Sequence, residues 1–218
     1  MAYPLFFTDG SQFSHTLGKI VCVGRNYAEH AKELNNPIPT EPILFIKPES
    51  SAVSLNDDLS IPGSDCHYET EIAILIGASL TAANEAEAKA AIVGVGLGLD
   101  LTRRALQSKL KEKSHPWEIA KSFDGACPLT DFAKSDQFPD LTNLQFSLYI
   151  NEELKQSGNS EDMLNPVVPL IAHMSKYFTL KPGDIVLTGT PKGVGELRSG
   201  DLLKLNLMDK VKIDTKVV

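Results

Sequence analysis

Two glutamates beside one buried strand constrain this chain more than any other feature. Residues 72–77, Ile-Ala-Ile-Leu-Ile-Gly, are apolar, rich in branched side chains and closed by glycine, which is typical of a buried strand. Glu69 and Glu71 come just before this run, and they face the same way because side chains alternate along a strand. Two carboxylates so close repel each other and are costly to bury without a cation. The pair therefore predicts a divalent metal site.

A third carboxylate is predicted to join this site. Residues 93–100 form an apolar strand that ends in Asp100, a natural third oxygen ligand. Oxygen ligands favour Mg²⁺, Mn²⁺ or Ca²⁺ over Zn²⁺. Two alternatives remain open: one glutamate is solvated while the other pairs with Lys or Arg, and Asp100 only caps the helix that follows it. The alternating glycines of this strand do not follow the G-x-G-x-x-G pattern, so they indicate close backbone packing and not a nucleotide site.

Composition excludes several classes of partner. The 218 residues carry a formal net charge of −7, and no basic stripe is visible, so we expect no nucleic acid and no membrane as partners. Cys22, Cys66 and Cys127 form no C-x-x-C pair, which suits a reducing cytosol. No signal peptide or transmembrane run is visible. These features predict a cytoplasmic protein.

Residues 25–34 favour a short helix that follows a buried strand over 19–24. His30 and Glu33 are three residues apart, so they share one face of this helix. A carboxylate beside an imidazole raises its basicity and orients it, which makes the pair suitable as a water-activating base. The alternative is an ordinary surface pair.

Several other polar residues stand where they could face a site. Lys47 ends a strand predicted over 41–48, and Lys121 lies among small and aromatic residues. The helix predicted over 103–113 places Arg104 and Gln107 on one face. The Gly/Pro loop that contains Thr190 lacks the G-K-[ST] signature of a P-loop, but its hydroxyls and N–H groups could hold a carboxylate.

Many short strands and a few helices predict a mainly β (α+β) protein, built as one closed roll or sandwich. Residues 1–18 are interpreted as an N-terminal arm, and residues 19–218 as a single domain. The remaining predicted elements are short strands over 52–55 and 59–62, helices over 82–92 and 166–177, a hairpin over 144–156 that turns at Asn151-Glu152, and strands over 185–188 and within 202–217.

Taken together, these motifs resemble the fumarylacetoacetate hydrolase family, and most of all its short acylpyruvase-type members. The resemblance covers residues 19–217. It implies a mixed β-sandwich roll, assembled as a homodimer, with one Mg²⁺ or Mn²⁺ held by Glu69, Glu71 and Asp100. The residues that carry it are Gly24-Arg25-Asn26-Tyr27, His30, Glu33, Lys47-Pro48, Glu69, Glu71, Asp100, Lys121-Ser122-Phe123-Asp124, Thr188-Gly189-Thr190-Pro191 and Gly193-Val194-Gly195.

The resemblance also implies roles for the other residues. His30 and Glu33 would form a water-activating dyad on a lid, and Lys121 would neutralise developing negative charge. One departure concerns the segment after Asp100, where relatives often carry an acid at the position of Ala105 and lack the extra base Arg103. The expected substrate contacts are Arg25, Lys47, Arg104, Gln107 and Thr190.

The expected reaction is metal-dependent hydrolysis of a carbon–carbon bond. An acylpyruvate (a 2,4-dioxo acid such as acetylpyruvate or fumarylpyruvate) would be cleaved to pyruvate and a carboxylic acid through pyruvate enolate. Arg25 or Arg103 could then meet the far carboxylate of a fumaryl group. Because oxaloacetate yields the same kind of enolate, the alternatives are an oxaloacetate decarboxylase or keto–enol tautomerase. A metal-stabilised binding domain without turnover is the more remote alternative.

Overall fold

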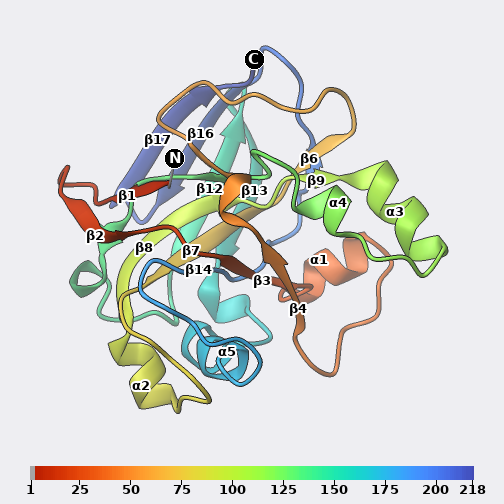
Figure 1. The fold of residues 1–218 in the computed structure, drawn as a ribbon. Helices are drawn as coiled ribbons and strands as arrows, with labels where there is room; N and C mark the ends of the chain where they lie inside the picture. Colours follow the sequence, from red (N-terminus) through yellow and green to blue (C-terminus); the bar gives the residue numbers. More distant parts are fainter. Residues whose placement is uncertain (1–2) are drawn as a thin grey trace.

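An eight-stranded mixed sheet forms the centre of the computed structural model, which describes residues 3–218 (Figure 1). Its strands run in the order β4-β3-β14-β7-β8-β10-β5, and β11 also pairs with β8. The pairs β14–β3 and β10–β5 are parallel, and the others are antiparallel. The strands are β3 (Ile20–Gly24), β4 (Ile43–Lys47), β5 (Ala52–Ser54), β7 (Thr70–Ile76), β8 (Ile92–Leu99), β10 (Cys127–Leu129), β11 (Ala133–Lys134) and β14 (Ile185–Leu187).

The two strands that flank the predicted acidic site lie in the middle of this sheet. Every residue of β7 is buried, as expected for a continuous apolar run covered on both faces. In β8, Gly96 lies opposite Ala73, and a Cβ added there would come 2.9 Å from Oγ1 of Thr130. The alternating glycines therefore serve close packing, as predicted.

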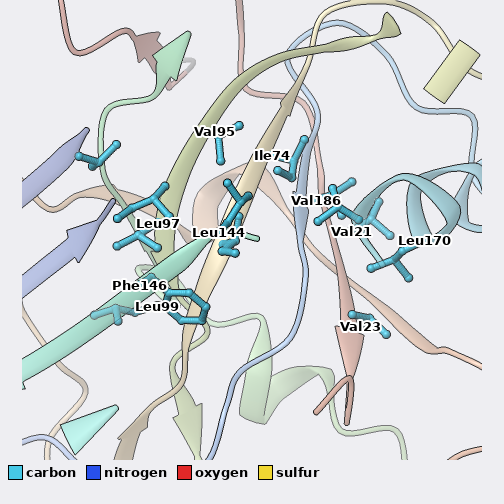
Figure 2. Packing of buried hydrophobic residues seen from close by; sticks show 14 of the residues in the cluster. Val21, Val23, Ile74, Val95, Leu97, Leu99, Leu144, Phe146, Leu170 and Val186 are labelled. Atoms are coloured by element: carbon cyan, nitrogen blue, oxygen red, sulfur yellow. The ribbon is translucent and has the colours of Figure 1, made fainter. Parts of the chain in front are cut away.

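A second, four-stranded sheet covers one face of the first, in the order β13-β12-β16-β17. Its β12–β13 hairpin turns at Asn151 and Glu152, both at positive φ, where the sequence predicts the turn. Phe146 of β12 belongs to the same buried cluster as Leu97 and Leu99 of β8, and Figure 2 shows their side chains facing one another. The strands are β12 (Gln145–Ile150), β13 (Glu153–Asn159), β16 (Leu202–Leu207) and β17 (Val211–Lys216).

The helices gather at two places (Figure 1). Helices α1 (Ala28–Glu33), α3 (Arg104–Glu112) and α4 (Glu118–Lys121) lie together at the right of the view, whereas α2 (Glu85–Ala90) and α5 (Val167–Met174) lie at the bottom. Helices α1, α2, α3 and α5 fall within segments where a helix was predicted and are shorter than predicted, whereas α4 was not predicted. Three 3-10 turns are η1 (Glu49–Ser51), η2 (Ser135–Gln137) and η3 (Ser160–Asp162).

Two small sheets complete the molecule. One, in the order β15-β6-β9, consists of β15 (Gly195–Glu196), β6 (Cys66–Tyr68) and β9 (Thr102–Arg103). The other pairs β1 (Pro4–Phe6) with β2 (Gln12–Thr16) within the predicted arm, which buries Leu5 and Leu17. No helix within residues 3–218 is long and apolar enough to cross a membrane.

The expected fold class, mainly β with short helices, is confirmed. One predicted element is wrong, because no strand forms over 59–62. Leu59 makes only an isolated bridge to Val217. Pro62 has no N–H to donate to a partner strand, and Gly63 at φ +90° turns the chain away.

Candidate metal centre and active site

Three carboxylates meet where β7 begins and β8 ends. Glu71 is the second residue of β7, Glu69 directly precedes that strand, and Asp100 directly follows β8. Because β7 and β8 are antiparallel neighbours, with Thr70 opposite Leu99, these two ends coincide. One carboxylate oxygen from each acid lies within 4.8 Å of the others, and all three side chains are buried. The structure thus brings the three predicted ligands together.

Two of the carboxylates are matched by cations. Nζ of Lys121 lies 2.9 Å from Oε2 of Glu69 and 2.6 Å from Oδ2 of Asp100. The guanidinium of Arg104 also donates to Oε1 of Glu69. Burial alone would raise the pKa of Glu69, but Lys121 and Arg104 outweigh it and hold that pKa below its usual range.

Glu71 has no such cation. Its Oε2 accepts one hydrogen bond, from the backbone N–H of Gly189 at 2.6 Å. Burial, followed by repulsion from Asp100 and Glu69, raises the pKa of Glu71 well above its usual range. A further positive charge beside this carboxylate would lower its pKa again.

A bound cation would account for two features of the triad, the raised pKa of Glu71 and the Asp100 oxygen that accepts no hydrogen bond. It would favour the ionised form of Glu71, and it could contact Oδ1 of Asp100, a buried atom that accepts no hydrogen bond and is paired with the ammonium of Lys47. The donors are all carboxylate oxygens, the ligand type that hard divalent cations prefer. The acidic triad can therefore bind a metal ion.

Lys47, a predicted substrate contact, lies behind the acidic triad. Its side chain is fully buried, and Nζ donates to the carbonyl oxygens of Lys121 and of Ala126, the latter at 3.0 Å. The same ammonium lies 2.8 Å from Oδ1 of Asp100 as an ion pair. Lys47 does not line the cavity, so it supports the acidic site from behind.

A cavity of about 420 Å³ opens over the triad. It is bounded by the end of β3 and by α1, α3 and α4, the three helices that lie together at the right of Figure 1. The predicted site residues that line it are Arg25, His30, Glu69, Glu71, Asp100, Arg104, Gln107, Lys121 and Thr190. The exposed Arg103 does not line it, so it is not placed to meet a bound carboxylate.

His30 enters this cavity from α1, which ends where Asn35 turns at positive φ ahead of Pro37. His30 is buried, and its Nδ1 lies 3.4 Å from Oε2 of Glu33. The other oxygen of Glu33 accepts a hydrogen bond from the N–H of Gly193 at 3.0 Å. The Gly/Pro loop thus holds two carboxylates by backbone N–H groups, those of Glu33 and Glu71.

Some functional positions escape sequence reasoning. Gln156, in a hairpin strand, is buried, and its Oε1 accepts from the N–H of Thr70 at 2.9 Å. Its Nε2 donates to Oγ1 of Thr190 at 2.8 Å, which fixes a residue of the cavity wall. No local pattern signals this contact, because its partners are 86 and 34 residues away. Lys111, which also lines the cavity, could have been found by its helical spacing from Gln107.

Comparison with known proteins identifies the family of this chain. The family model described as "Fumarylacetoacetate (FAA) hydrolase C-terminal" matches residues 19–218. The chain belongs to the fumarylacetoacetate hydrolase family. A solved structure of another family member, the fumarylpyruvate hydrolase of Pseudomonas aeruginosa in complex with Mn²⁺ and pyruvate, is similar with a TM-score of 0.92 and 30% identity, covering 100% of this chain and 96% of that one.

Two curated relatives are more similar in sequence. The oxaloacetate tautomerase YcgM of Escherichia coli (strain K12) is 48% identical over 212 residues, which covers 96% of each chain. A mitochondrial oxaloacetate decarboxylase of Dictyostelium discoideum is 40% identical over 200 residues, covering 90% of this chain and 92% of its own. This fumarylacetoacetate hydrolase family member therefore lies nearer to enzymes of oxaloacetate than to fumarylpyruvate hydrolase.

These relatives contradict acylpyruvate hydrolysis as the expected reaction. They better support the alternative, an oxaloacetate decarboxylase or keto–enol tautomerase. The His30–Glu33 pair led to the error. A base that can activate water can equally move a proton on carbon, so its presence does not separate hydrolysis from the reactions of oxaloacetate.

Proposed function

We propose that this chain catalyses the keto–enol interconversion of oxaloacetate, with Mg²⁺ or Mn²⁺ bound by Glu69, Glu71 and Asp100. The observation that carries the proposal is the near full-length similarity, at 48% identity, to an oxaloacetate tautomerase. The geometry agrees with it, since a buried imidazole (His30) and a buried ammonium (Lys121) line the same cavity as the acidic triad.

The reaction moves one proton and one electron pair. The keto form loses a proton from C3, the C2–C3 bond becomes double, and the C2 oxygen gains a proton. The bound cation supplies Lewis-acid polarisation of the α-keto-acid oxygens. The protein must then provide a base for C3 and positive charge near the C2 oxygen, and it must hold the substrate in place.

His30 is the proposed base. Its Nδ1 faces Glu33, and a hydrogen bond there leaves Nε2 as the nitrogen that can accept the C3 proton. Glu33 is itself held by the N–H of Gly193, so the imidazole keeps one orientation. In the reverse direction His30 returns the proton to C3.

Lys121 is the proposed source of positive charge. Burial alone would lower its pKa, but Asp100 and Glu69 outweigh that effect and raise it, so the side chain stays an ammonium. It stabilises the negative charge that develops on the C2 oxygen. Arg104, whose Nη1 lies 3.0 Å from Oε1 of Gln107, is oriented to bind a substrate carboxylate.

Decarboxylation of oxaloacetate is the second candidate, favoured by the 40% identity to an oxaloacetate decarboxylase. It would pass through the enolate of pyruvate and would use Lys121 in the same way, but it needs no base at C3. Loss of His30 should therefore affect the two reactions differently.

The test is a turnover measurement on metal-stripped protein with Mg²⁺ or Mn²⁺ added back. Oxaloacetate enol is followed by its ultraviolet absorbance, and CO₂ release is measured in parallel. We expect metal-dependent interconversion that is much faster than CO₂ release, and His30→Ala should lower its kcat by about a hundredfold or more. Interconversion no faster than in buffer with metal would refute the proposal. CO₂ release that survives His30→Ala would favour the decarboxylase.

The assembly and the compartment stay predictions. We propose a homodimer, which light scattering can test, with a small α-keto acid as the ligand. A cytoplasmic location is likewise proposed from the sequence alone.

A further inference from the structure

One lysine at the cavity has no part in the chemistry described so far. Lys111 lies on α3, seven residues after Arg104 and four after Gln107, so the three share one face of that helix. All three line the cavity. Arg104 contacts the metal-binding Glu69, whereas Lys111 stands about 10 Å further along the helix axis and is exposed. This face of α3 therefore runs from the acidic triad to the solvent side of the cavity.

The ammonium of Lys111 is held in place but not neutralised. Its Nζ lies 5.9 Å from the ring centroid of Trp117, which packs against Phe45 at 5.0 Å between centroids. Both aromatic rings line the cavity. Within residues 3–218, Lys111 forms no salt bridge, in contrast to Lys121, which contacts two carboxylates. An aromatic wall thus fixes a lysine whose charge is free to meet a ligand.

The charges around Lys111 are mostly of the same sign. Partial burial of its ammonium, followed by repulsion from Arg25 and Arg104, lowers the pKa of Lys111. Arg25 also lines the cavity, and it adopts φ +58°, a left-handed conformation that is uncommon for a non-glycine residue. Positive groups held close together around a cavity attract an anion.

We propose that Lys111 binds the far carboxylate of a dicarboxylic keto acid and so determines the preference of this site for diacids. The α-keto-acid end lies at the acidic triad, and the second carboxylate points along α3 towards Lys111, with Arg25 on the opposite wall. The identity of the substrate rests on the proposed function, but the binding role of Lys111 does not.

Lys111→Gln tests this proposal, because glutamine keeps much of the length of the side chain without its charge. Lys109→Gln is the matched control: it removes an exposed lysine from the same helix that does not line the cavity. The substrates are oxaloacetate and its 4-methyl ester, which lacks only the far negative charge. We expect Lys111→Gln to lower the ratio of kcat/KM for oxaloacetate over that for the ester by about tenfold, mainly through KM, as for one lost charge-assisted hydrogen bond. Lys111→Arg should restore much of the ratio, and Lys109→Gln should leave it unchanged.

A binding arm separates this proposal from the proposed reaction. Dissociation constants of malate and malate 4-methyl ester are measured by calorimetry on the Mn²⁺-loaded protein, where no turnover is needed. If Lys111→Gln weakens the binding of malate but not that of malate 4-methyl ester, the role of Lys111 is supported even if oxaloacetate proves not to be turned over. Equal losses for the diacid and its monoester, or no loss for either, would overturn it.

Discussion

Replacing Lys47 by methionine should destabilise the protein without acting on substrate directly. The Nζ atom of Lys47 holds the carbonyl oxygens of Lys121 and Ala126 and pairs with Asp100, with both charged side chains at most 1% exposed. Removing one member of a buried ion pair costs about 3–5 kcal/mol. Asp100 would keep its contact with Lys121, but its Oδ1 and the two carbonyl oxygens would lose the ammonium of Lys47. For a chain of this size each kcal/mol lowers the melting temperature by about 2–4 °C, so we expect a fall of roughly 10 °C.

The assay is thermal unfolding of the protein in a chelator, so that bound metal does not mask the loss. Lys32→Met is the control, since this side chain is 68% exposed and pairs only with Glu29 on the surface. Adding Asp100→Asn to Lys47→Met should recover part of the stability, because it removes one of the buried negative charges that Lys47 no longer helps to balance. A raised KM with an unchanged melting temperature would instead restore Lys47 as a substrate contact and refute this reasoning.

Two further predictions concern the walls of the site. Since the pKa of Glu71 is raised in the folded state, the metal-free protein loses stability as pH rises through that pKa, and Mg²⁺ competes with the proton. The rise in melting temperature on adding Mg²⁺ should therefore grow as the pH is raised above the ordinary range of a glutamate, and Glu71→Gln should abolish this growth. A response independent of pH in the unsubstituted protein would contradict it. Gln156→Leu leaves the N–H of Thr70 unpaired, which should cost about 1–3 kcal/mol in thermal unfolding. It also releases Thr190 and should raise the KM for oxaloacetate, whereas an unchanged KM would show that Thr190 needs no such support.

Local patterns were enough to predict the elements that carry the acids. The apolar run after Glu71 and the glycine-spaced run before Asp100 each describe a buried strand, and a strand pair must bring such ends together if it is antiparallel. The pair His30 and Glu33 follows from helical spacing in the same way. These contacts depend on residues close together in the sequence or on two adjacent strands, so they can be predicted from the sequence.

What the patterns missed depends on distant packing or on chemistry shared between reactions. Lys47 ends a strand, as predicted, but only the folded chain shows that three segments close over its ammonium. Gln156 lies in a hairpin whose alternation gives no sign that it reaches the loop at Thr190. No single residue distinguishes hydrolysis from proton transfer, because both reactions would use the same carboxylates and the same imidazole.

The position of β14 has a consequence for how the chain is made. This strand of three residues, Ile185–Leu187, lies between β3 and β7 and pairs with both. During synthesis, β3 and β7 therefore leave the ribosome long before the strand that joins them, and their facing edges stay unpaired until most of the chain has been translated. Exposed apolar edges promote association with other chains, and pairing between distant segments is slow. We expect a nascent chain that ends before residue 185 to aggregate or to bind chaperones, and one that extends past β14 to be protected.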